Sequence, residues 1–203
     1  MKFIIRPQFS ALLSYLGMTA SVAGIFLTLK YGPYTGLLCL IFATICDLFD
    51  GTFARRFKRT DFEKRFGIHI DSLADVLNFV ALPVFLIIFM MDGSLWCVPL
   101  IILYAGCGVT RLAVFSAEAD AETSKRYFRG VPAAYVALLL PLIYIAQAHL
   151  GRGAGLFVCA APVSILSILF VLDIRVRRPG PVGYIVILLL AVALSAGVLY
   201  AGV

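Results

Sequence analysis

Seven stretches of this sequence contain no aspartate, glutamate, lysine or arginine, and together they make up most of its length. They are residues 7–29, 31–46, 76–91, 93–110, 130–151, 153–172 and 179–203. About 20 predominantly apolar residues span the hydrocarbon core of a bilayer as a helix, and two of the shorter stretches extend into flanking sequence. The sequence therefore predicts an all-α, polytopic helical bundle with six to seven transmembrane helices, in a single transmembrane domain over residues 1–203.

The composition excludes the soluble and disordered classes. Of the 203 residues, 62% are hydrophobic and 14% are charged, whereas a soluble domain has roughly 45–50% apolar and about 25% charged residues. In a soluble chain the net charge of +6 would favour nucleic-acid binding, which needs a basic face. Here the basic residues lie in loops beside the membrane, so we expect them to attract anionic lipid headgroups and expect no nucleic-acid partner.

The basic residues are unevenly distributed between the two sides of the predicted bundle. Fourteen of the 17 lysines and arginines fall at the N-terminus and in the loops after the second, fourth and sixth stretches. Lys30 and Arg152 fall on the other side, and Arg111 lies near the end of the fourth stretch. Because cytoplasmic loops are enriched in lysine and arginine, we expect a protein of the cell membrane with its N-terminus in the cytoplasm.

Four of the 11 acidic residues border the longest basic loop from both sides. Asp47 and Asp50 lie at the end of one apolar helix, and Asp71 and Asp75 lie at the start of the next, so the spacing puts each pair on one helix face. A carboxylate at membrane depth costs on the order of 2.5–3.5 kcal/mol, so it normally faces the protein interior and serves a site. We expect the two helices to run antiparallel and to bring their acidic faces together.

Four carboxylates in one low-dielectric site need compensating positive charge. Hard divalent cations prefer oxygen ligands, and Mg²⁺ in particular is commonly shared between carboxylates and substrate phosphates. Gly51 and Ala54 are small and lie on or beside the acidic face, so a bulky ligand can approach the helix backbone there. Arg55 offers a cation for phosphate oxygens. The pattern indicates a metal site that handles a phosphate compound.

The segment from Asp47 to Asp75 reads DxxDGxxAR, eleven further residues, and then GxxxDxxxD. In this pattern it resembles the CDP-alcohol phosphotransferase family. The resemblance implies a membrane enzyme that moves a phosphatidyl group from a CDP-linked lipid to an alcohol and releases CMP. It also implies a homodimer, and the basic loop between the two motif halves puts the active site on the cytoplasmic side.

Carried onto this sequence, the resemblance assigns roles to individual residues of the core motif, 47–75. It makes Asp75 the catalytic base that accepts the proton of the attacking hydroxyl. The ligands of Mg²⁺ or Mn²⁺ would be Asp47, Asp50, Asp71 and Asp75. The contacts to the CDP-lipid would be Gly51, Ala54, Arg55 and Gly67.

Outside the core motif the sequence is similar to the phosphatidylserine synthase branch of that family. Members carry SFGVAP, RLARFN and YFxGLPxP stretches, and the matching stretches here are NFVALP at 78–83, RLAVFS at 111–116 and YFRGVP at 127–132. Val80, Val114 and Ser116 depart from that pattern, so we expect differences in the acceptor pocket. The resemblance implies CDP-diacylglycerol as donor and L-serine as acceptor, with glycerol 3-phosphate, inositol phosphate or another alcohol as alternatives.

An amino-acid acceptor needs a cation for its carboxylate and an acid or carbonyl for its ammonium group. Arg111 and Arg129 are the candidate cations, for the acceptor or for the lipid phosphate, and Glu118 is the candidate ammonium partner. Arg129 also fits a role as an interfacial residue that extends toward the headgroups, and Glu118 lies in an acid-rich loop that solvent would cover.

Two other classes share part of the pattern. A cation transporter would disperse its acidic residues over several helices near the middle of the membrane. Intramembrane prenyltransferases carry their acidic motifs in separate, distant repeats. The four aspartates here gather at one end of two helices, beside small residues and an arginine, which favours the phosphotransferase interpretation.

Overall fold

The structure of the protein is a computed structural model that describes residues 9–120, 127–150, 155–177 and 181–202. These residues are almost entirely helical. The α-helices are α1 (Leu12–Tyr31), α2 (Pro33–Ala54), α3 (Asp61–Val76), α4 (Leu82–Met90), α5 (Cys97–Asp120), α6 (Val136–Leu150), α7 (Gly155–Val171) and α8 (Pro181–Gly202). Short 3₁₀ turns at Phe9–Ala11 and Ala133–Tyr135 lead into α1 and α6.

Within the described ranges, 6 helices are long and apolar enough to cross a membrane. One of them is the continuous rod Asp61–Met90, which contains both α3 and α4. Helix α7 is also apolar but shorter, with its apolar part at Phe157–Val171. The predicted all-α bundle of six to seven helices is therefore confirmed, and the protein is a multi-pass membrane protein.

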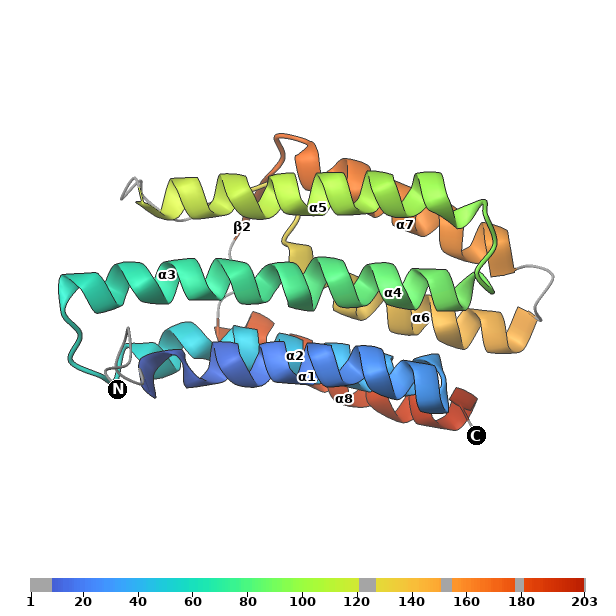
Figure 1. The fold of residues 1–203 in the computed structure, drawn as a ribbon, viewed down its shortest axis with the longest axis horizontal. Helices are drawn as coiled ribbons and strands as arrows, with labels where there is room; N and C mark the ends of the chain where they lie inside the picture. The colour runs from blue at the N-terminus through green and yellow to red at the C-terminus, as the bar shows by residue number, and fades with distance from the viewer. Residues whose placement is uncertain (1–8, 121–126, 151–154, 178–180, 203) are drawn as a thin grey trace, which may run out of the picture.

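The helices lie side by side with their axes along the length of the molecule, in three layers (Figure 1). Helices α1, α2 and α8 form one layer, the α3–α4 rod lies in the middle with α6, and α5 and α7 form the third layer. One apolar core connects the three layers. It contains Leu82 and Leu86 of the middle layer together with Leu40 of α2 and Tyr104 of α5. The acidic motif lies at the contact between the first two layers.

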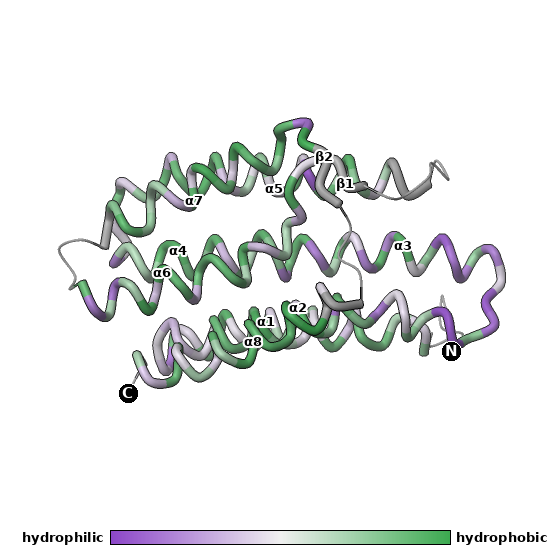
Figure 2. The backbone as a smooth tube through the Cα atoms, turned by 180° about the vertical axis from the view of Figure 1, so that it is seen from behind, coloured by the Kyte–Doolittle hydropathy of each residue, from purple (hydrophilic) through white to green (hydrophobic). Residues whose placement is uncertain are grey.

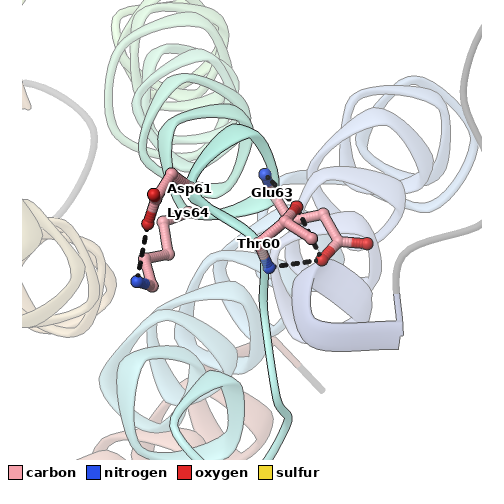
Figure 3. A network of polar contacts seen from close by, with 4 residues as sticks. All are labelled: Thr60, Asp61, Glu63 and Lys64. Carbon is pink, nitrogen blue, oxygen red and sulfur yellow. Dashed lines mark hydrogen bonds and ion pairs between the residues drawn. The ribbon is translucent and has the colours of Figure 1, made fainter.

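Helix α3 begins earlier than the sequence indicated. The long basic stretch after Arg55 was expected to be a loop, but α3 starts at Asp61 with a capping box, in which Thr60 and Glu63 satisfy each other's backbone N–H groups (Figure 3). Asp61 also pairs with Lys64 at 2.9 Å. Figure 2 shows the hydrophilic residues gathered at this turn. Asp71 and Asp75 therefore lie in the second half of α3 rather than at the start of a helix.

Helix α1 buries only small residues, which are Ser14, Gly17, Ser21, Gly24 and Thr28. Their spacing of three and four residues places them on one face of the helix. A Cβ atom added at Gly24 would lie 2.8 Å from the Cβ of Cys39 in α2, so the backbones of α1 and α2 approach closely along this face. We refer to these five residues as the small-residue stripe.

The α3–α4 rod contains a π-helical turn at Leu77–Ala81. Pro83 follows it, and proline has no N–H to donate to the carbonyl of Phe79, four residues earlier. The hydroxyl of Tyr104 in α5 donates to this carbonyl instead, at 2.6 Å, and the pair is buried. Such turns often occur next to functional sites, and this one begins two residues after Asp75.

A small feature that the sequence did not predict is a two-stranded antiparallel ribbon. Strands β1 (Tyr127–Arg129) and β2 (Arg175–Arg177) pair with Phe128 opposite Val176. The ribbon joins the α5–α6 connection to the α7–α8 connection. The backbone of Gly130, just after β1, adds a further hydrogen bond to the carbonyl of Ile174 at 2.8 Å.

Candidate active site

The four aspartates of the motif come together between α2 and α3. Asp47 and Asp50 lie in the last third of α2, and Asp71 and Asp75 lie in the antiparallel helix α3. One carboxylate oxygen from each of Asp47, Asp71 and Asp75 lies within 4.8 Å of the others. Asp75 is buried, with 8% of its surface exposed, and the other three are half-buried. The predicted convergence of the two acidic faces is present.

Asp50 joins the cluster through a residue that the sequence did not single out. The Ser14 hydroxyl of α1 lies 3.2 Å from Oδ2 of Asp50 and 3.4 Å from Oδ1 of Asp71. Ser14 itself is buried. The only signal for it in the sequence is a polar residue in an apolar stretch, and serines of that kind usually bond to their own helix.

A cavity of about 300 Å³ opens beside the four carboxylates. Its wall includes all four aspartates, Arg111 of α5 and residues of the 3₁₀ turn Ala133–Tyr135, α6 and α8, among them Ala133, Leu138 and Ile187. Phe79, Phe115 and several aliphatic side chains line the rest of the cavity. An apolar wall with a few convergent charged groups is the usual form of a small-ligand site.

Arg111 is the cationic residue of this wall. Its side chain is buried, with 6% exposed, its Nε donates to the carbonyl of Val131 at 3.2 Å, and its guanidinium carbon lies 5.6 Å from the ring centre of Phe115. These contacts hold the guanidinium in one orientation, as recognition of a planar carboxylate or phosphate requires.

Gly130 allows the backbone after β1 to come close to Arg111. Its φ angle is +74°, a conformation that glycine adopts without steric cost. A Cβ atom at this position would lie 2.8 Å from the carbonyl oxygen of Phe170 and 3.4 Å from Nε of Arg111. The turn that presents the Val131 carbonyl to Arg111 therefore depends on glycine.

The residues predicted to contact the CDP-lipid lie at the open end of α2 and α3, and among the described residues the cavity wall includes none of them. A side chain added at Gly51 would meet nothing within 4 Å, and one at Gly67 would meet only Nη1 of Arg59, at 3.6 Å. Arg55 follows Ala54 at the end of α2 and is exposed, with Nη2 donating to Thr52 at 3.2 Å. Both glycines thus leave the adjoining helix surface accessible.

The last two predicted residues are Glu118 and Arg129. The structure describes their backbones but not their side chains. Their backbones place Glu118 in the last turn of α5, where the sequence had suggested a loop, and Arg129 in β1 opposite Arg175.

The donor set of the cluster fits a hard divalent cation. Metal–oxygen distances of about 2.0–2.6 Å allow ligand oxygens on one ion to lie up to about 4–5 Å apart. The oxygens of Asp47, Asp71 and Asp75 meet this condition, and carboxylate oxygens suit Mg²⁺ and Mn²⁺. These residues could therefore hold a divalent cation, and the same cavity is lined by a buried guanidinium that suits an anionic ligand.

The model of the CDP-alcohol phosphatidyltransferase family matches residues 8–172. The chain belongs to this family. The matched region contains Ser14, all four aspartates and Arg111. Helix α8, which contributes Ile187, Leu188 and Ala191 to the cavity, follows it.

Curated relatives from bacteria and an archaeon are similar to this chain. CDP-diacylglycerol–serine O-phosphatidyltransferase of Mycobacterium tuberculosis strain H37Rv is 32% identical over 147 residues, which cover 70% of this chain and 50% of the relative. Archaetidylserine synthase of Methanothermobacter thermautotrophicus is 27% identical over 169 residues, covering 81% of this chain and 68% of the relative. The similarity thus spans about half the length of the mycobacterial protein.

Proposed function

We propose that this protein transfers the phosphatidyl group of CDP-diacylglycerol to the hydroxyl of L-serine, yielding phosphatidylserine and CMP. The observation that carries the proposal is the convergence of Asp47, Asp71 and Asp75 with Arg111 on one cavity. Membership of the CDP-alcohol phosphatidyltransferase family supports the reaction class. The names of two relatives, which refer to serine, support the acceptor.

In this proposal the carboxylates of Asp47, Asp50, Asp71 and Asp75 hold Mg²⁺ or Mn²⁺. When bound, the metal neutralises charge on the phosphate oxygens of the donor. The accessible backbone at Gly51 and Gly67, with Ala54 and Arg55 beside Gly51, receives the CDP part of the lipid. The lipid-proximal phosphate then lies between these residues and the cavity.

The reaction forms one bond and breaks another at that phosphate. The serine oxygen bonds to phosphorus, the bond from phosphorus to the CMP oxygen breaks, and CMP leaves. Asp75 accepts the proton of the serine hydroxyl as general base. Its burial between α2 and α3 keeps this carboxylate in one position and limits access of water that would compete with serine.

Arg111 is our candidate for the acceptor carboxylate. A guanidinium can hold a carboxylate or a phosphate through paired N–H groups, so Arg111 can alternatively hold the lipid phosphate. We retain Arg129 as a second candidate cation and Glu118 as the candidate partner of the serine ammonium group.

We further propose that residues 1–203 form a single transmembrane catalytic domain with its site on the cytoplasmic side of the cell membrane and its N-terminus inside. The excess of basic residues in the loops on one side supports this orientation. The proposed homodimer rests on the family resemblance alone.

The test is an assay of CMP release by the purified protein in lipid nanodiscs with CDP-diacylglycerol and Mg²⁺ or Mn²⁺. L-serine, glycerol 3-phosphate and inositol phosphate are supplied one at a time. We expect CMP and phosphatidylserine with L-serine. CMP with a different acceptor would replace serine in the proposal, whereas no CMP with any acceptor would overturn it. Metal flux into liposomes that contain the protein would instead support the transporter alternative.

A further inference from the structure

Helix α1 carries no carboxylate, yet it contacts the acidic cluster directly through Ser14. The Ser14 hydroxyl is within hydrogen-bonding distance of Asp50 in α2 and of Asp71 in α3, at 3.2 and 3.4 Å. Three helices therefore meet at this hydroxyl, which is 7% exposed. The inference below rests on the proposed function, because it concerns how the metal-binding carboxylates are held.

The position of the hydroxyl has a clear electrostatic effect. Two ionised carboxylates repel each other and accept hydrogen bonds but cannot donate them. A hydroxyl placed between them can donate its proton to either oxygen, which partly offsets their repulsion when no cation is bound. It also restricts how the two carboxylates rotate, because the single hydroxyl proton can be donated to either of them or shared between the two facing oxygens.

Helix α1 is itself held in register with the α3–α4 rod by a second hydrogen bond. Ser21 donates to Oδ1 of Asn78 at 2.7 Å, and both residues are buried. Ser21 lies seven residues after Ser14, and Asn78 lies seven residues after Asp71, so the two hydrogen bonds are two helical turns apart on both helices. Asp75 lies between them, and the small-residue stripe brings the α1 backbone close enough for both contacts.

We propose that Ser14 is a positioning residue that holds the carboxylates of Asp50 and Asp71 in the geometry required for divalent-metal binding. Residues that bond to metal ligands without touching the metal orient those ligands, and their loss typically weakens metal affinity about 10–100-fold. Ser14 meets this description for two ligands from two different helices.

The experiment compares Mn²⁺ binding by the protein and by its Ser14→Ala variant. The electron paramagnetic resonance signal of free aqueous Mn²⁺ reports binding without turnover or lipid substrate. We expect Ser14→Ala to bind Mn²⁺ about tenfold more weakly than the unchanged protein. The matched control is Ser167→Ala in α7, since Ser167 is also buried but donates to Val163 of its own helix at 2.7 Å. Ser167→Ala should leave Mn²⁺ affinity unchanged.

A second readout separates positioning from a general loss of structure. With CDP-diacylglycerol and L-serine, Ser14→Ala should need a higher Mn²⁺ concentration for half-maximal CMP release and should approach the unchanged kcat at saturating Mn²⁺. Equal Mn²⁺ affinity in Ser14→Ala and the unchanged protein would overturn the inference and leave the proposed function standing. A lowered kcat at every Mn²⁺ concentration would also overturn it. Failure of the unchanged protein to bind Mn²⁺ would instead count against the metal site, and so against the proposed function.

Discussion

The two walls of the cavity are built in different ways. The acidic wall comes from two consecutive helices, and its aspartates lie within a segment of 29 residues, Asp47 to Asp75. The cationic wall combines Arg111 of α5 with Pro132, and the turn before Pro132 is held in place by Gly130, which has a positive φ and a hydrogen bond to Ile174. The four carboxylates of the acidic wall are thus encoded in one short segment, with Ser14 of α1 as a distant contact, whereas the cationic wall is itself assembled from distant segments. We infer that the first serves the chemistry that all acceptors share and the second selects the acceptor.

The strongest test of this division is Asp75→Asn. Asparagine keeps a side-chain oxygen that can bind metal but cannot accept the serine proton, so we expect turnover to fall about 10²–10⁴-fold while Mn²⁺ and CMP still bind. The measurements are CMP release and Mn²⁺ titration on the same preparation. The control is Asp61→Asn, which changes an exposed aspartate at the start of the same helix. Loss of CMP binding in Asp75→Asn would argue against its role as the base.

The cationic wall is tested by Arg111→Ala. If Arg111 binds the serine carboxylate, the KM for L-serine should rise by about 10–100-fold, as expected from loss of a charge-assisted hydrogen bond. The KM for CDP-diacylglycerol should stay nearly constant and serves as the internal control. A rise in the KM for CDP-diacylglycerol alone would assign Arg111 to the lipid phosphate and would contradict the division of roles.

A smaller effect is expected for Gly130→Ala, which strains the turn of the cationic wall without altering charge. Positive φ costs a non-glycine residue on the order of 1–3 kcal/mol, and the added Cβ would also crowd Phe170 and Arg111. We expect a lower Tm together with a higher KM for L-serine. Gly106→Ala in α5 is the matched control, because a Cβ there meets nothing within 4 Å. A normal KM for L-serine in Gly130→Ala would mean that the turn does not shape the acceptor pocket.

The smallest expected effect is that of Thr60→Ala at the start of α3. Loss of a helix N-cap typically costs about 1 kcal/mol of stability, and Thr60 is exposed and lies outside the cavity wall. Thermal unfolding should therefore shift slightly, and the KM values and kcat should not change. Altered Mn²⁺ binding in this variant would show that the acidic wall depends on the N-terminal cap of α3.

Much of the fold and the acidic wall could be predicted from the sequence because both follow from local patterns. Charge-free stretches predict the helices, and the spacing of Asp47, Asp50, Asp71 and Asp75 predicts their common faces. The prediction of where α3 begins was wrong, because the charged residues after Asp61 suggested a loop. Thr60 and Glu63 form a capping box that the sequence pattern contains. A dense run of charges on an interfacial helix resembles a solvated loop when only hydropathy is considered.

Contacts between distant residues were not predictable in the same way. Ser14 is 36 residues from Asp50 and 57 residues from Asp71, and no pattern within α1 points to either partner. The pairing of β1 with β2 joins segments on either side of α6 and α7, and short strands in loops carry little sequence signal. The placement of Arg111 against the Val131 carbonyl likewise follows from packing of α5 against the turn, which only the folded chain shows.

The π-helical turn at Leu77–Ala81 has a consequence for how the two halves of the α3–α4 rod are oriented. Compared with a regular α-helix of the same sequence, one extra residue in a turn rotates the residues after it by about 100° about the helix axis. The face of α3 that carries Asp71 and Asp75 and the face of α4 that enters the apolar core therefore point in different directions around the rod. Because of this offset, one continuous rod presents its carboxylates to the cavity and its apolar side chains to a different set of neighbours.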